Sequence, residues 1–84
     1  MTRNEFEKKW DKNLLEVLGF IIGEKALVPC SINCYKDGNE WIIRDIDERQ
    51  DVYERLRGDE ETVFNKIDGM AQRYYKREKE NGRL

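Results

Sequence analysis

The stretch CSINCYKDGNEWIIRDI, residues 30–46, decides the fold, because it is typical of two strands joined by a tight turn. Apolar and polar side chains alternate on both sides of Asp37 and Gly38, two residues that tolerate the positive φ of a hairpin loop. With those two residues as the loop, Cys34 faces Trp41 across the hairpin. The register predicts a buried face of Ile32, Cys34, Trp41 and Ile43, and a wetter face of Asn33, Tyr35, Glu40, Ile42 and Arg44.

The segments on either side of the hairpin differ in how clearly they indicate strands. Residues 52–57 alternate in the same way, after a polar turn, and predict a third antiparallel strand. Pro29 has no backbone N–H, so it belongs at the beginning or at the exposed edge of a strand. Residues 20–28 give conflicting signals, since Ile21 and Ile22 favour burial whereas Gly23 and the charges after it favour a turn.

Two amphipathic segments flank the predicted strands. Thr2 and Glu5 have the spacing of a capping box, and apolar residues then recur at helical spacing, so we expect a helix over residues 3–18 that ends at Gly19. Asp59 can cap a second helix, with an apolar stripe of Val63, Phe64, Ile67, Met70, Ala71 and Tyr74. We expect residues 77–84 to fray, because no apolar anchor precedes Leu84.

These elements predict a single α+β domain over residues 1–84. It consists of an N-terminal helix, a three-stranded antiparallel meander and a C-terminal helix, with both helices packed on one face of the sheet. The opposite face of the sheet is then open to water or to a partner.

Composition limits the environment and the chemistry of the chain. There are two cysteines and no histidine in 84 residues. Cys30 and Cys34 in one strand lie about 13 Å apart, too far for a disulfide, so we expect two buried free thiols and a cytoplasmic protein. No apolar run reaches the roughly 18–20 residues that cross a bilayer, so we expect no membrane contact. Residues 1–84 carry no secretory signal.

The motifs of catalysis and cofactor binding do not occur, and we expect a protein that is not an enzyme and has no cofactor or metal. General acid–base catalysis at neutral pH most often uses histidine. A phosphate-binding glycine loop and a Cys-x-x-Cys pair are also missing. Asp45 and Asp47 share one strand face and offer the geometry of a hard-cation site, but surface solubility explains them better.

Charge is separated along the chain, although the total is only −2. Residues 45–65 hold eight acidic and three basic side chains, a net charge of −5, whereas residues 66–84 hold six basic and three acidic ones, a net charge of +3. An acidic surface attracts a basic protein by electrostatic steering. A solvated acidic face without a specific partner is an equally good explanation.

Residues 34–76 also resemble a known family. The motifs are Tyr-x-Asp-Gly-x-x-Trp at residues 35–41, Asp-x-Asp-Glu-Arg at residues 45–49, and Gly-Asp-Glu-Glu at residues 58–61, before a helix that contains Phe64. In these motifs the chain is similar to small bacterial immunity proteins of polymorphic toxin systems, in particular to immunity protein 59. The resemblance implies a cytoplasmic protein that binds a cognate toxin and occludes its active site. The segment at residues 20–29 and the basic tail depart from the family pattern, so the identity of the toxin does not carry over.

Three functions remain open at this point. The first is a toxin-neutralising protein that contacts a basic toxin through Asp45, Asp47, Glu48, Asp51, Tyr53, Glu54 and Tyr35. The second is a phage or mobile-element accessory protein that binds nucleic acid through Arg73, Tyr74, Lys76, Arg77 and Lys79. The third is a self-associating module that uses the open sheet face or the edge strand after Pro29. We expect a monomer or a weak homodimer.

Overall fold

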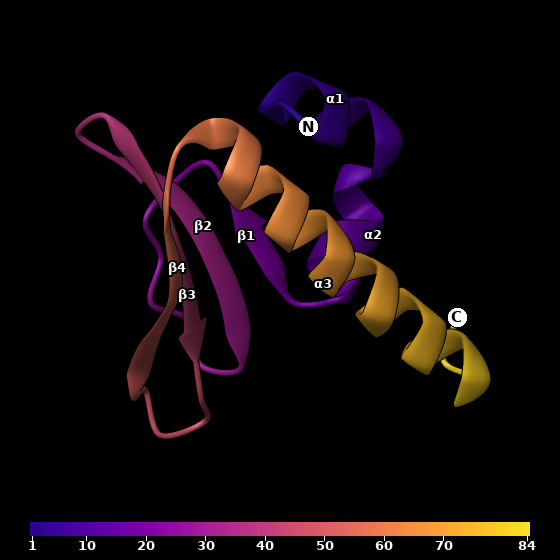
Figure 1. Cartoon of the computed structure of the whole chain (residues 1–84). Helices are drawn as coiled ribbons and strands as arrows, with labels where there is room; N and C mark the ends of the chain where they lie inside the picture. Colours follow the sequence, from indigo (N-terminus) through magenta and orange to yellow (C-terminus); the bar gives the residue numbers. More distant parts are fainter.

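The computed structural model describes all residues 1–84 and shows a four-stranded mixed sheet covered by one long and two short helices (Figure 1). The helices are α1 (Arg3–Lys9), α2 (Lys12–Val17) and α3 (Glu60–Glu80). The strands are β1 (Phe20–Ile22), β2 (Ser31–Asp37), β3 (Glu40–Ile46) and β4 (Val52–Gly58), and they lie in the order β1-β2-β3-β4. None of the three helices is long and apolar enough to cross a membrane.

The β2–β3 hairpin is confirmed, but its register differs from the predicted one. Cys34 pairs with Ile43 rather than with Trp41, and the loop consists of Gly38 and Asn39. Gly38 has a φ of 63°, which fits a type II′ turn, where glycine takes the first central position. The register moves by two residues and the side-chain period is also two, so every predicted face assignment in this hairpin still holds.

A strand that the sequence did not predict extends the sheet beyond β2. β1 pairs with β2 in parallel, with Ile22 opposite Cys34, so the prediction of three antiparallel strands is wrong in this detail. Parallel strands need a crossover connection, and residues 23–30 provide it. β2 is therefore an internal strand, and the expected free edge after Pro29 does not exist.

The crossover covers part of the sheet face that we expected to be open. Asn33 points to this face and bonds the crossover: its Nδ2 donates to the carbonyl oxygens of Ile21 and Glu24 at 3.0 and 2.7 Å, and its Oδ1 accepts from Ala26 N at 2.8 Å. Residues on the same face are buried as a consequence: Ser31, Asn33, Tyr35, Ile42 and Ile46. The expectation of an open face is therefore wrong over β2 and β3.

β4 is the predicted third antiparallel strand, but its alternation is interrupted. The pairs Ile43–Leu56 and Arg44–Glu54 leave Arg55 unpaired in a bulge. A bulge changes which side chains share a face. Tyr53 and Leu56 consequently lie on the helix side of the sheet, whereas Glu54 and Arg57 lie on the opposite side.

The predicted N-terminal helix is broken into α1 and α2. The capping box of Thr2 and Glu5 is present, but Trp10 is extended and Asp11 caps a new helix by accepting a hydrogen bond from Leu14 N at 3.1 Å. α2 ends before Gly19, whose φ of 89° confirms the predicted stop. Asp59 caps α3 as predicted, and α3 extends to Glu80, within the segment where we expect fraying.

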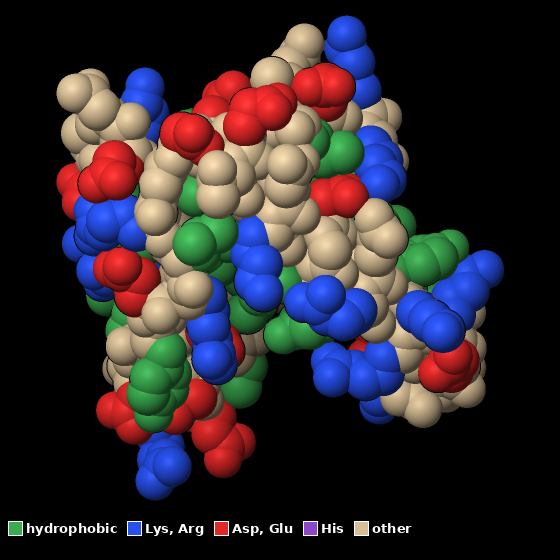
Figure 2. Space-filling model, viewed as in Figure 1, with side chains coloured by type: hydrophobic (Ala, Val, Ile, Leu, Met, Phe, Trp, Pro, Cys, Tyr) green, Lys and Arg blue, Asp and Glu red, His purple; other side chains and the backbone are tan.

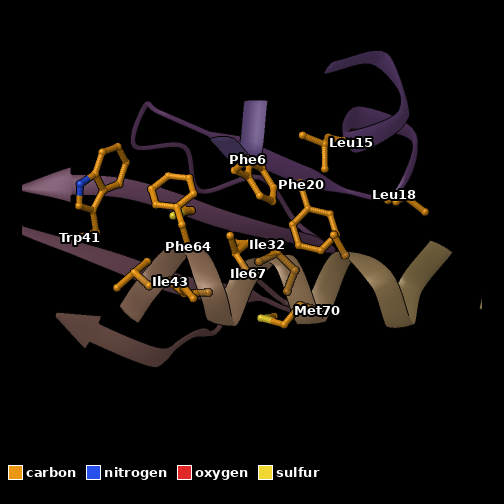
Figure 3. Packing of buried hydrophobic residues seen from close by; sticks show 13 residues of the cluster. Phe6, Leu15, Leu18, Phe20, Ile32, Trp41, Ile43, Phe64, Ile67 and Met70 are labelled. Carbon is orange, nitrogen blue, oxygen red and sulfur yellow. The ribbon is translucent and has the colours of Figure 1, made fainter. Parts of the chain in front are cut away.

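The hydrophobic core lies between the sheet and the helices (Figure 3). The predicted inward residues of β2 and β3 are all buried, including Trp41, whose ring meets that of Phe64 edge to face at 4.9 Å. Phe64 also contacts Phe6 of α1, with ring centroids 5.5 Å apart. Both short helices and α3 thus cover the same face of the sheet, which confirms the predicted layering.

The two cysteines differ, contrary to the prediction that both are buried. Cys34 is fully buried, and burial raises the pKa of its thiol to about 12. Cys30 is exposed in a turn with a φ of 63°, before β2 begins. Both thiols are free.

Candidate protein-binding surface

Five of the seven side chains predicted to bind a partner lie together at the β3–β4 turn. We call this set the acidic surface: Asp45, Asp47, Glu48, Asp51 and Tyr53. Asp45 pairs with Tyr53 across the strands, and the other three residues belong to the connecting turn. Figure 2 shows carboxylates gathered at this turn, at the lower left of the view.

Asp47 builds the turn from within. Its Oδ1 accepts hydrogen bonds from Arg49 N at 2.9 Å and from Asp51 N at 3.0 Å, and its backbone N–H donates to Asp51 O at 3.1 Å. An aspartate that bonds the backbone a few residues ahead is the usual way to stabilise such a turn. The positions of Glu48 and Asp51 therefore follow from a local interaction.

The charges of the acidic surface are only partly neutralised within the protein. Asp45 forms an ion pair with Arg55, whose Nη2 lies 2.6 Å from Oδ2. Asp47, Glu48 and Asp51 form no ion pair. The negative electrostatic field in the solvent thus comes from the three carboxylates of the turn rather than from Asp45.

Tyr53 is the aromatic residue of this surface, and 47% of it is exposed. The negative charges of Asp51 and Asp47 raise the pKa of its phenol, with a smaller contribution from desolvation. The Arg55 guanidinium lies 6.0 Å from the ring centroid. Tyr53 therefore presents an apolar ring and a hydroxyl group inside a negative field.

Two predicted residues do not belong to the acidic surface. Tyr35 is only 6% exposed, because the crossover lies over it, so the expectation that it is free for a partner is wrong. Glu54 follows Tyr53 directly in β4, so strand alternation places it on the opposite sheet face, where it forms an ion pair with Arg57 at 3.3 Å. Neither side chain can act together with Tyr53.

A pocket of about 470 Å³ separates the acidic surface from α3. Asp45, Asp47 and Glu48 line one side of it, and Tyr74 and Arg77 line the other. The space-filling view shows the outline hollowed between the β3–β4 turn and the C-terminal half of α3 (Figure 2). A partner seated on the acidic surface would therefore meet α3 as well.

A second, larger concavity was not predicted from the sequence. A groove of about 870 Å³ runs between the two short helices and the crossover, lined among others by Phe6, Trp10, Phe20 and Val28. Its charged lining residues are of both signs. The groove depends on the parallel pairing of β1, and no local sequence pattern signals that pairing.

The side chains do not form a metal centre, since no group of three or more histidine, cysteine, aspartate or glutamate residues could hold an ion. The chain matches no protein-family model, and comparisons with curated proteins and with solved structures give no match either. The resemblance to immunity protein 59 stays a prediction.

Proposed function

We propose that this chain is an immunity-type protein that binds a basic bacterial toxin through the acidic surface and neutralises it by occlusion. The observation that carries the proposal is Tyr53, a half-exposed aromatic side chain whose pKa is raised by Asp51 and Asp47. Tyrosine is enriched among the residues that dominate binding energy at protein interfaces. Unpaired carboxylates around such a residue speed the encounter with a cationic protein and favour it over an anionic one.

The position of these residues supports neutralisation by occlusion. The turn between β3 and β4 projects at one end of the molecule (Figure 1). A projecting turn reaches into a concave site more readily than a flat sheet face does. The motif resemblance supports the same function, because the Asp-x-Asp-Glu-Arg motif at residues 45–49 forms this turn.

The direct test uses the protein encoded immediately upstream of the gene, where the proposal expects a toxin, expressed in a bacterial host with and without this chain. We expect the chain to restore growth and to bind the purified toxin domain at a ratio of one to one. Tyr53→Ala should weaken binding by about 30-fold or more, the effect of removing a residue that dominates an interface. Leu27→Ala is the matched control, because Leu27 is also 47% exposed but lies on the crossover. An equal effect of the two substitutions, or no binding at all, contradicts the proposal.

The rate of association with the toxin tests the electrostatic part of the proposal separately. The double substitution Glu48→Lys and Asp51→Lys should slow association about tenfold at low salt and reduce the salt dependence of the rate. Glu16→Lys with Glu24→Lys changes the net charge by the same amount at exposed positions away from the turn. If both pairs of substitutions slow association equally, only the net charge matters and the acidic surface has no specific role.

A further inference from the structure

Five basic side chains of α3 form no ion pair within the protein: Lys66, Arg73, Lys76, Arg77 and Lys79. Lys79 lies against Tyr75, with its Nζ 5.6 Å from the ring centroid. We call the other four residues the basic side of α3. All four side chains are exposed, and Figure 2 shows Lys and Arg groups gathered over the C-terminal half of α3.

Helical geometry brings these residues onto one stripe. Lys66, Arg73 and Arg77 are spaced by seven and four residues, which correspond to about two turns and one turn at 3.6 residues per turn. Arg77 is held against Tyr74, with its Cζ 4.8 Å from the ring centroid. A guanidinium fixed in this way is well suited to bind a carboxylate or a phosphate through two parallel hydrogen bonds.

The fold itself does not explain Gly69, which lies between Lys66 and Arg73. A Cβ built on Gly69 would meet only Arg73 Nη1, at 3.5 Å, which is an ordinary contact. Alanine there would stabilise the helix by roughly 1 kcal/mol relative to glycine. The missing side chain leaves room for a partner to approach the backbone of α3 closely.

The basic side of α3 and the acidic surface border the same pocket. Arg77 and Tyr74 line it opposite Asp47 and Glu48, and Glu78, which forms an ion pair with Arg83, also lies on the α3 wall. A ligand that pairs both with Arg77 and with the carboxylates of the turn must therefore carry both signs of charge. A nucleic acid placed along α3 would bring its phosphates towards the carboxylates of the turn, and their repulsion disfavours it.

We infer that the basic side of α3 binds an acidic segment of the toxin. This is the same toxin whose basic side chains meet the acidic surface. This inference rests on the proposed function and adds a second contact area with a defined chemistry. The toxin then presents cationic side chains to Asp47, Glu48 and Asp51, and carboxylates to Arg73 and Arg77. Of these five residues, Asp47, Glu48 and Arg77 line the pocket.

The test compares three proteins for binding to the C-terminal domain of the protein encoded upstream, the expected toxin. Arg73→Glu with Arg77→Glu reverses two charges of the basic side of α3. Lys8→Glu with Lys36→Glu makes the same change in net charge at exposed residues that do not line the pocket. We expect the α3 variant to bind at least about tenfold more weakly than wild type, and the control to bind within about threefold.

The outcomes separate this inference from the proposed function. If the α3 variant binds as tightly as wild type, the inference is wrong and the proposed function still holds. If none of the three proteins binds the toxin, both are wrong. Tighter binding of a 20-base-pair DNA duplex than of the toxin, lost in the α3 variant, would instead assign the basic side of α3 to nucleic acid.

The substitution Gly69→Leu separates an effect on folding from an effect on binding, because it should raise the stability of the protein and lower its affinity for the toxin. Leucine favours the helix over glycine, so the variant should unfold at a higher denaturant concentration than wild type. The added side chain should at the same time weaken toxin binding about tenfold by blocking close approach to α3. Higher stability with unchanged affinity contradicts close approach at Gly69.

Discussion

Asn33 shows how one side chain fixes the topology of this fold. Its side chain is fully buried, and its amide makes three hydrogen bonds to the backbone of residues 21–26. The crossover has no regular structure of its own, so these bonds replace the ones that a helix or strand would supply. The parallel pairing of β1 and the burial of Tyr35 both depend on this arrangement.

Replacing Asn33 with alanine should therefore destabilise the whole protein. The substitution leaves two backbone carbonyl oxygens and one N–H group without their partner, and each unsatisfied buried group costs about 1–3 kcal/mol. We expect the free energy of unfolding to fall by about 2–4 kcal/mol in urea titrations followed by tryptophan fluorescence. Asn13→Ala, at an exposed position in α2, should change it by less than about 0.5 kcal/mol. Similar effects of the two substitutions would show that the crossover does not depend on Asn33.

Among the elements, α1 and α2 depend on α3 for their position. Asp68 of α3 accepts a hydrogen bond from Trp10 Nε1 at 2.8 Å and from Gln72 Nε2 at 2.7 Å, and forms an ion pair with Lys9 at 2.9 Å. Burial raises the pKa of Asp68, but these hydrogen bonds outweigh it and the pKa is lowered overall. The break between the two short helices is thus held against the long one by the Asp68 carboxylate, together with the packing of the Trp10 ring on Tyr75, whose centroids are 6.1 Å apart.

The lowered pKa of Asp68 makes this stabilisation depend on pH. A carboxylate with a lowered pKa in the folded state stabilises the fold above its unfolded pKa, near 3.8, and this contribution is lost as the pH falls through the folded value. Asp68→Asn should lower the free energy of unfolding by about 1–2 kcal/mol at pH 7. The difference from wild type should shrink as the pH drops below 3.8. A difference in the free energy of unfolding that is constant between pH 7 and pH 3 would show that Asp68 does not act through its charge. The control is Glu16→Gln, which removes a carboxylate at an exposed position.

The individual elements also show which features of the fold could be predicted from local sequence patterns and which could not. The hairpin, the third strand, the cap at Asp59 and the acidic turn depend on residues close together in the chain, and they were predicted. β1 has only three residues, too few to show a period, and its partner begins at Ser31, nine residues after β1 ends. The break at Trp10 did have a local signal, the capping residue Asp11, but the helical spacing of apolar residues on both sides masked it.

The two errors at the candidate surface have different causes. Tyr35 alternates correctly with its neighbours, yet the crossover covers it, and no pattern in β2 reveals that cover. Glu54 follows Tyr53 directly in β4, so strand alternation, which is a local rule, already places the two side chains on opposite faces. The acidic turn itself was predicted because Asp47 builds it from residues that are adjacent in the chain.

At the scale of the whole molecule, charge is separated in space as it is in sequence. The molecule measures 39 × 32 × 17 Å, so the acidic surface and the basic side of α3 lie on a thin body and share one pocket. A dipolar surface of this kind orients a partner as well as attracting it. The larger groove adjoins this pocket, because Gly19, Cys30 and Ser31 line both.

The most direct measurement is amide chemical-shift mapping by NMR of the isotope-labelled chain, titrated with the C-terminal domain of the protein encoded upstream, the proposed toxin. The proposed binding mode predicts the largest shift changes at residues 47–53, with a second set at Arg73 and Arg77, and little change at the hairpin tip around Gly38. Changes confined to the groove between the short helices and the crossover, or spread along the hairpin tip, would contradict binding through the acidic surface.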